Sequence, residues 1–306
     1  MTLVAGFAPD GRGRAVLYLA AMMARSAGDD VVVGAIVPRP WPPSPGRVDA
    51  EYQASLEAIA NAALDRARAR LPADIRAVYA VHHARSAPAG LLELAEQHDA
   101  SVVVTGSSGA GGPGHVSLGS VTARLLHSSP VPVAIAPHGF RAARDARVRR
   151  VTAAFGGVAD DLIVAAAGVA GRVGATLRLA SFAVRAHAPI TAGVGTGPER
   201  SVIEQWTEEI QAAARAALEE VEELPVPPAQ LEAVVGHGET WDEALEDVEW
   251  EDGDVLVVGS SSTGPIARVF LGSRASKIVR HSPVPVVVVP RGAAAELAEE
   301  VVEGTV

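Results

Sequence analysis

The feature that most constrains this chain is a segment that occurs twice. In the first copy a VVTGSSG run at residues 103–109 is followed by LGS at 118–120 and SPVPV at 129–133. In the second copy VVGSSS at 257–262 is followed by LGS at 271–273 and SPVPV at 282–286. Every matched position is displaced by 153 residues in a chain of 306. The sequence therefore predicts two homologous domains of ordinary size.

Composition excludes several classes of function. The sequence has no cysteine, which removes disulfides, thiolate catalysis and cysteine metal sites. Its formal net charge of −10 argues against nucleic acid as a partner, since phosphate binding of that kind needs clustered cations. No apolar run approaches the roughly 20 residues that span a bilayer, and no basic region precedes the first strand-like run. We expect a cytoplasmic protein that has no membrane partner.

Strand-like and helix-like runs alternate along both halves, which is typical of a parallel sheet covered by helices on both faces. The expected boundaries are residues 1–140 for the first domain, 141–150 for a linker, 151–292 for the second domain and 293–306 for a C-terminal tail. In the first half we expect strands at 3–7, 31–37, 75–81, 101–105 and 131–136, and helices at 14–25, 51–70, 88–97 and 121–127. In the second half we expect strands at 150–155, 176–184, 230–235, 255–259 and 284–289, and helices at 160–173, 201–223, 240–248 and 274–280.

The repeated segment is where a ligand would bind. A strand that ends in glycine and a Gly-Ser pair that opens a helix present backbone amides and a helix amino terminus to the space beyond the strand ends, where an anion is the natural occupant. Glycine allows close approach and positive φ, and the Ser120 hydroxyl can donate to a phosphate or cap the helix. The candidate residues are Gly106, Ser107, Gly109, Gly119, Ser120 and Val121 in the first copy and Gly259, Ser260, Gly272 and Ser273 in the second.

Three rival motifs fail. A GxGxxG match at 109–114 contains a proline and opens no helix, no lysine follows Gly119 as a P-loop requires, and the last glycine of a GxSxG elbow is absent from both copies. Neither a nucleophile–base pair nor a two-carboxylate site can be nominated. His82 and His83 are adjacent on an expected strand, so their side chains point to opposite faces and do not share a metal. We therefore nominate no catalytic residue and no metal ligand.

The spacing Gly106-x2-Gly109-x9-Gly119-Ser120, followed by SPVPV, resembles the nucleotide-binding signature of universal stress proteins, and the repeat resembles their tandem members. The resemblance covers essentially the whole chain. It implies five parallel strands per domain in the order 3-2-1-4-5, with helices on both faces and domains paired through their last strands. It also implies that backbone near Gly6 and Ile36 contacts the nucleotide, with adenine at the end of the second strand. ATP-binding members hold the ribose with an aspartate at the end of the first strand, where this chain has Ala8 and Gly156.

Two functions remain open at this stage. The first is a stress-response protein that binds ATP with Mg²⁺, mainly in the first domain, with a signalling or regulatory role and at most slow hydrolysis. The second is an interaction or oligomerisation module that keeps the fold without the ligand. The intact first-domain glycines favour the former, and the missing aspartates favour the latter. A flavin- or adenylate-using relative is a weaker third alternative.

The second copy departs further from the signature. Ser262 stands where the first copy has Gly109, and Arg274 stands where it has Val121. We therefore expect weaker nucleotide binding in the second domain. The last strands are expected to pair within the chain or across a homodimer, since Pro132 and Pro285 suit edge strands. The five arginines between residues 141 and 150 are interpreted as a solvated linker.

Overall fold

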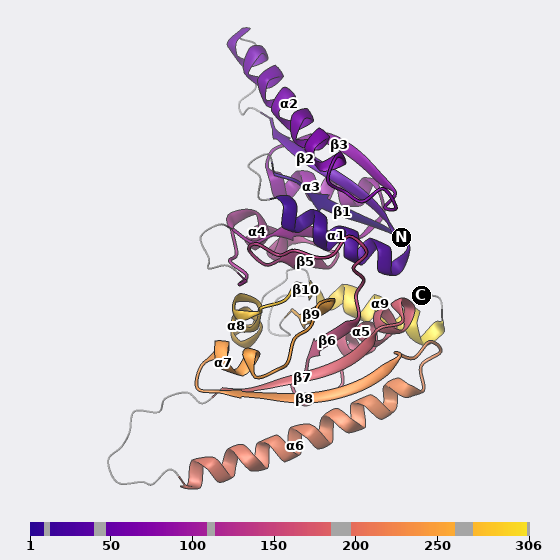
Figure 1. Ribbon diagram of the computed structural model, residues 1–306, viewed down its shortest axis with the longest axis vertical. Coiled ribbons are helices and arrows are strands. Elements are labelled where there is room, and N and C mark those ends of the chain that lie inside the picture. Colours follow the sequence, from indigo (N-terminus) through magenta and orange to yellow (C-terminus); the bar gives the residue numbers. More distant parts are fainter. Residues whose placement is uncertain (9–12, 40–46, 109–113, 185–196, 261–271, 305–306) are drawn as a thin grey trace, which may run out of the picture.

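The structure is a computed structural model that describes residues 1–8, 13–39, 47–108, 114–184, 197–260 and 272–304. Strands and helices alternate through the first domain (Figure 1). The elements are β1 (Thr2–Gly6), α1 (Gly13–Ala27), β2 (Asp30–Pro38), α2 (Arg47–Arg68), β3 (Ala77–Ala84), α3 (Ala87–Gln97), β4 (Ala100–Gly106), α4 (Ser120–Ser128) and β5 (Val133–Ala136).

The second domain repeats this order and adds one helix at its end. Its elements are β6 (Arg150–Ala154), α5 (Asp161–Val173), β7 (Thr176–Val184), α6 (Gly197–Glu222), β8 (Gln230–Gly238), α7 (Trp241–Glu246), β9 (Asp254–Gly259), α8 (Ser273–His281), β10 (Val286–Val289) and α9 (Arg291–Glu303).

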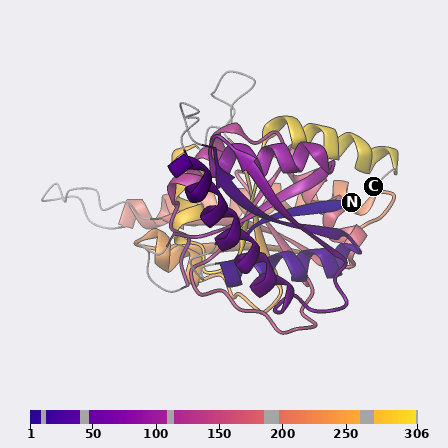
Figure 2. The ribbon, with the colours of Figure 1, turned by 90° about the horizontal axis from the view of Figure 1, so that it is seen from above.

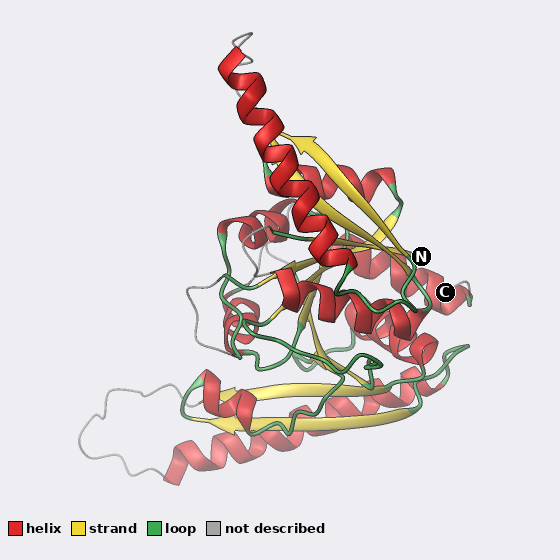
Figure 3. Cartoon of the chain, turned by 45° about the horizontal axis from the view of Figure 1, so that its top comes forward, coloured by secondary structure: helices red, strands yellow, loops and turns green. Residues whose placement is uncertain are grey.

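All of these strands belong to one sheet in the order β3-β2-β1-β4-β5-β10-β9-β6-β7-β8. Each half is parallel and has the strand order 3-2-1-4-5, so the expected tandem α/β fold is confirmed. The two halves meet where β5 pairs antiparallel with β10, with Ala134 opposite Val287. The expected pairing of the last strands is thus confirmed within one chain. Figure 3 shows the two longest helices, α2 and α6, at opposite ends of the assembly.

Alternation along each strand sends side chains into two cores. Leu3 and Ala5 of β1 pack with α1 and α2, whereas Val4 packs with α3 and α4. In the second domain α5, α6 and α9 contribute to the first of these cores, and α7 and α8 contribute to the second. Helices therefore lie on both sides of the strands (Figure 2). None of the helices in the described parts of the chain is long and apolar enough to cross a membrane.

Two details at the junction of the domains differ from expectation. β5 and β10 begin after Pro132 and Pro285, because proline has no N–H to donate to the sheet. Each of these prolines instead accepts a hydrogen bond from the neighbouring strand, Pro132 from Val103 at 3.0 Å and Pro285 from Leu256 at 2.9 Å. The strands are therefore shorter than expected, but the residues before them still belong to the hydrogen-bonded sheet.

The linker and the C-terminal segment are both more ordered than the sequence suggested. The carbonyl of Ala146 accepts a bond from Arg25 at 3.0 Å, and the N–H of Val148 donates to Ser26 Oγ at 2.7 Å, which ties the linker to the end of α1. The interpretation of all five linker arginines as solvated is wrong for Arg150, which begins β6 and lies in an ion-pair cluster. The expected tail at 293–306 is mostly the helix α9, which packs on α5.

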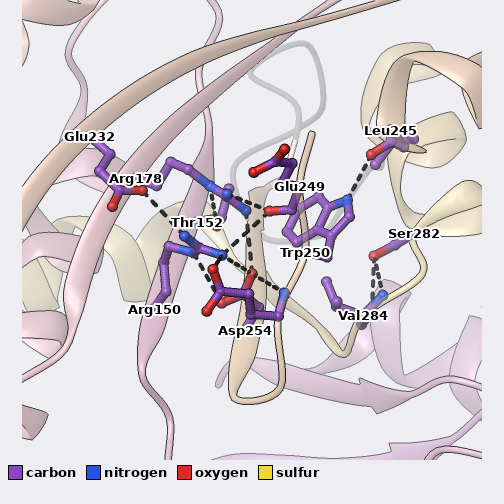
Figure 4. A network of polar contacts seen from close by, with 11 residues as sticks. Arg150, Thr152, Arg178, Glu232, Leu245, Glu249, Trp250, Asp254, Ser282 and Val284 are labelled. Carbon is purple, nitrogen blue, oxygen red and sulfur yellow. Dashed lines mark hydrogen bonds and ion pairs between the residues drawn. The ribbon is translucent and has the colours of Figure 1, made fainter. Parts of the chain in front are cut away.

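The ion-pair cluster occupies the amino-terminal ends of the second-domain strands (Figure 4). The Asp254 carboxylate, only 1% exposed, accepts bonds from Arg150 Nε at 3.0 Å and Arg150 Nη2 at 2.8 Å, and Arg178 Nη2 lies 3.5 Å away. Arg178 also donates to Thr152 Oγ1 at 3.1 Å and stacks over the Trp250 ring at 4.8 Å. Two guanidiniums surround one buried carboxylate, so the cluster fixes the starts of β6, β7 and β9 together.

Candidate functional site

The candidate site is a cleft of about 530 Å³ at the carboxyl ends of β1, β2 and β4. The strand order reverses between β1 and β4, which is where open parallel sheets bind ligands. The structure brings the predicted first-domain residues that it describes together in this cleft, and Gly109 lies outside the described residues. Those lining the cleft are Gly6, Ile36, Gly106, Ser107, Gly119, Ser120 and Val121.

One part of the cleft is apolar. Val37 at the end of β2 and Leu56 of α2 belong to one core and line this part together with Ile59 of α2. The Ile36 side chain instead packs on the opposite face of the sheet, against Gly90 of α3. Ile59 is 48% exposed, so the fold leaves an apolar wall open at this point rather than burying it. Such a slot suits a flat, largely apolar group.

The opposite part of the cleft is lined by Ser107 and Ser108. Both bond to Ser117, in the segment that leads into α4. Ser107 Oγ accepts a bond from the N–H of Ser117 at 2.6 Å, and the Ser108 and Ser117 hydroxyls are 2.8 Å apart. The N–H of Ser108 also donates to the carbonyl of Ser117 at 2.7 Å. The hydroxyl of Ser107 is therefore occupied in holding this segment.

Helix α4 points its amino terminus at the cleft. Gly119 is the N-cap residue, with φ −73° and ψ 170°, and has no side-chain cap. Ser120 is the first helical residue and is exposed, so of its two suggested roles that of helix cap is wrong, and its hydroxyl is available to a ligand. The first N–H groups of a helix have no intrahelical acceptor and carry a partial positive charge. This end of α4 is a natural place for an anion.

Close packing, rather than a positive φ, explains why glycine occupies positions 106 and 119. Gly119 has an ordinary extended conformation, and Gly106 is absent from the glycines with positive φ in the described chain. A Cβ at Gly119 would lie 3.0 Å from the Cβ of Ser108, and one at Gly106 would lie 3.1 Å from Val16 Cγ2. The expectation of positive φ is therefore wrong at both positions. Glycine lets the β4 end, α1 and the start of α4 approach closely.

The described part of the cleft lining contains no charged side chain. Ala8 lines the cleft at the place where the family resemblance implies an aspartate, and none of the described lining residues carries a carboxylate. No group of three metal-ligating side chains occurs among the described residues. His82 and His83 bond Glu93 and Glu57 at 2.7 and 2.9 Å, on helices α3 and α2 of opposite faces, as their alternation predicts.

In the second copy a glycine again ends the strand and another again caps the helix, but the serine after the strand makes a different hydrogen bond. Gly272 is the N-cap of α8, and Ser273 and Arg274 follow it as exposed residues. The hydroxyl of Ser260 accepts a bond from the N–H of Arg291 at 3.0 Å, at the start of α9, which has no counterpart in the first domain. Gly259 ends β9, and Ser262 lies outside the described residues.

Sequence reasoning missed several residues of the cleft. Helical spacing in residues 51–70 correctly puts Leu56, Ile59 and Ala60 on one face, but periodicity does not say that this face extends past the sheet to overhang the cleft. Thr122 was also missed. Its hydroxyl, in a residue 2% exposed, donates to the carbonyl of Gly106 at 3.1 Å and anchors α4 to β4.

The geometry defines a tandem α/β protein. Its first domain has a cleft where the strand order reverses, with an apolar slot on one side and a helix amino terminus on the other. Comparison with known proteins agrees with that class. The sequence profile described as "Universal stress protein family" matches residues 2–137 and 149–290. The chain belongs to the universal stress protein family.

Individual relatives support the tandem arrangement. Universal stress proteins of Mycobacterium tuberculosis (strain ATCC 25618 / H37Rv) and Mycobacterium bovis are each 39% identical over 298 residues, covering 95% of this chain and 100% of theirs. A universal stress protein from Archaeoglobus fulgidus DSM 4304 has a similar solved structure, with a TM-score of 0.60 at 20% identity over 95% of this chain and 98% of that one. At that identity the structural match supports the fold alone.

Proposed function

We propose that the first-domain cleft binds an adenine nucleotide, ATP foremost, and that the protein acts as a signalling or regulatory component rather than a metabolic enzyme. The single observation that carries the proposal is the pairing of an apolar slot with a helix amino terminus across one cleft. A nucleotide has the same two ends, a flat base and an anionic phosphate chain.

The base would occupy the slot at the end of β2. Val37, Leu56 and Ile59 supply apolar contact there, and strand-end backbone groups, including that of Ile36, supply polar edges that can select adenine. This matches the position that the family resemblance implies for adenine. No charged group of the described lining competes for the base.

The phosphates would lie against the start of α4. The free N–H groups after Gly119 and the exposed Ser120 hydroxyl are donors suited to phosphate oxygens. The described lining offers no carboxylate for Mg²⁺, so the ion would arrive coordinated by the phosphates and water. When bound, it would neutralise part of the phosphate charge. Gly119, Ser120 and Val121 would orient the chain of phosphates around it.

Calorimetric titration of the whole chain with Mg-ATP tests this proposal. Gly119→Glu places a carboxylate in the phosphate position, and Gly119→Ala is the matched control because it adds only the Cβ. We expect the alanine variant to bind ATP within about tenfold of wild type, since Ser108 must move by only a few tenths of an ångström. The glutamate variant should lose binding while its melting temperature stays near wild type. If ATP raises the melting temperature of both variants equally, the phosphates do not lie at α4.

The interaction-module alternative rests on a specific observation: the described part of the cleft lining is uncharged and has Ala8 in place of the aspartate that the resemblance implies. Mass spectrometry of the small molecules released from freshly purified, denatured protein separates the two functions. A stoichiometric adenine nucleotide supports the binding proposal. Absence of nucleotide together with no titration signal at millimolar ATP favours the module.

A further inference from the structure

A second cavity lies between the domains. It shares no lining residue with the first-domain cleft. It measures about 130 Å³ and is covered by α1 of the first domain and by α5 and α9 of the second. Leu3 and Met23 line it from one domain, and Ala165, Val287 and Leu297 line it from the other. Most of the lining consists of Val, Leu, Ala and Met side chains, and its polar residues are Ser26, Asp29, Ser101 and Arg172. The cavity therefore exists only when the two domains are paired.

A cavity of this kind favours an apolar occupant. Water needs two or more hydrogen-bond partners to remain in a buried space, and the aliphatic part of the wall offers none. The buried walls include Leu3, Val255 and Ala166, which are 2%, 4% and 3% exposed. An engineered apolar cavity of similar volume is known to hold a benzene-sized molecule. The space thus suits a tail of about six to eight carbon atoms.

One charged group at the cavity is poorly satisfied. Arg172, in the last turn of α5, buries its Nε without any hydrogen-bond partner in the described structure. Its Nη1 contacts the Met1 thioether sulfur at 2.9 Å, and a thioether is a weak acceptor. The other charged residue of the lining, Asp29, already pairs with the Met1 ammonium at 3.2 Å. The Arg172 guanidinium therefore lacks an anionic hydrogen-bond acceptor at the cavity.

We propose that this interdomain cavity binds a medium-chain monocarboxylate, with its alkyl tail between the domains and its carboxylate on Arg172. A carboxylate satisfies the planar guanidinium better than any neutral acceptor, because the two groups can form paired, charge-assisted bonds. The tail contacts α5 and α9 of one domain and α1 of the other, so the ligand would strengthen domain pairing. Free fatty acids and acyl groups released from lipids share this chemistry.

Calorimetric titration of the whole chain with butanoate, hexanoate and octanoate, all below their micellar concentrations, tests the tail. We expect one site per chain and affinity that rises about fourfold per methylene until the cavity is full, since each buried methylene contributes a similar free energy. Ala165→Leu fills part of the cavity and should abolish octanoate binding. Octanoate affinity unchanged in that variant would overturn the proposal.

The head group is tested with Arg172→Met, which keeps an unbranched side chain and removes the charge. Arg215→Met is the matched control, because Arg215 is an exposed arginine of α6. We expect octanoate to bind wild type and the Arg215 variant at least tenfold more tightly than octan-1-ol does, and both probes to bind the Arg172 variant equally. Equal binding of octanoate and octan-1-ol to wild type would overturn the assignment of Arg172. Gly119→Glu should leave octanoate binding unchanged, which separates this site from the nucleotide cleft.

Discussion

At the residue scale, Asp254 is the most consequential buried charge in the second domain. Its carboxylate is shared by Arg150 and Arg178 and also accepts the N–H of Glu251 at 3.0 Å. Arg150 has its pKa raised, first by the hydrogen bond to Asp254, whereas burial lowers that of Arg178. Arg178 therefore depends on Asp254 for compensation of its buried charge.

Asp254→Asn should lower the free energy of unfolding by about 3–5 kcal/mol, because it leaves two guanidiniums against a neutral amide. Asp252→Asn is the control, since Asp252 is exposed two residues away, and it should change stability by less than about 0.5 kcal/mol. Urea unfolding of both variants measures the difference. Equal stability of the two variants would contradict the structural role given to the cluster.

A second residue-scale prediction concerns pH. Arg25 donates to both oxygens of Asp74, at 2.7 and 3.1 Å, and this hydrogen bonding lowers the pKa of Asp74 below its usual 3.8. A carboxyl whose pKa is lower in the folded state stabilises the fold above its unfolded pKa, and that contribution disappears as pH falls through the folded pKa.

Wild type should therefore be more stable than Asp74→Asn near neutral pH, and the difference should shrink as the pH falls from about 5 toward 2. The control Asp65→Asn removes an exposed carboxylate that pairs with Arg68 on the same helix, and it should show a much smaller pH-dependent difference. Denaturant unfolding at a series of pH values checks both. A difference for Asp74→Asn that does not change across this range would contradict the Arg25 bond.

At the element scale, the contact between α5 and α9 depends on a glycine. A Cβ at Gly168 would overlap the side chain of Val301, whereas a Cβ at Gly292 of α9 would meet nothing within 4 Å. Gly168→Ala should therefore destabilise the protein by about 1–3 kcal/mol through overpacking. Gly292→Ala is the control and should be neutral or slightly stabilising, because alanine is the better helix former.

A double-mutant cycle locates the strain. Val301→Ala removes the methyl groups that the new Cβ would meet, so the penalty of Gly168→Ala should be smaller in that background. An equal penalty in both backgrounds, measured by thermal unfolding with calorimetry, would mean that the strain does not come from α9.

The elements themselves were largely predictable from sequence because buried parallel strands and amphipathic helices have distinct periodicities. The strand at residues 176–184 has the expected bounds. Helix α9 was missed, although Ala294, Leu297, Ala298 and Val301 have helical spacing and Gly304 ends the helix in a left-handed conformation. Its alanine-rich sequence has only a weak difference between an apolar and a polar face. Its buried face packs on α5, a contact that local sequence does not encode.

At the scale of the whole molecule, the two domains share one sheet, and each of the two cores contains residues of both domains. Because β5 and β10 already pair with each other, neither strand is free to form the same contact with a second copy. The 153-residue repeat predicts two copies of the fold and the strands that join them. It does not predict that α2 overhangs the cleft or that a cavity forms between α1 and α5, since both depend on packing between segments distant in sequence.

The repeat also makes the amino termini of α4 and α8 a matched pair for testing the central claim, that nucleotide binds in the first domain. Gly119 and Gly272 are the N-caps of α4 and α8 and occupy equivalent positions. The decisive measurement is the stoichiometry and affinity of Mg-ATP for wild type, Gly119→Glu and Gly272→Glu by calorimetric titration of the whole chain. We predict one tight site in wild type that is retained in Gly272→Glu and lost in Gly119→Glu. Loss of the tight site in Gly272→Glu with retention in Gly119→Glu, or two sites of equal affinity, would contradict this account.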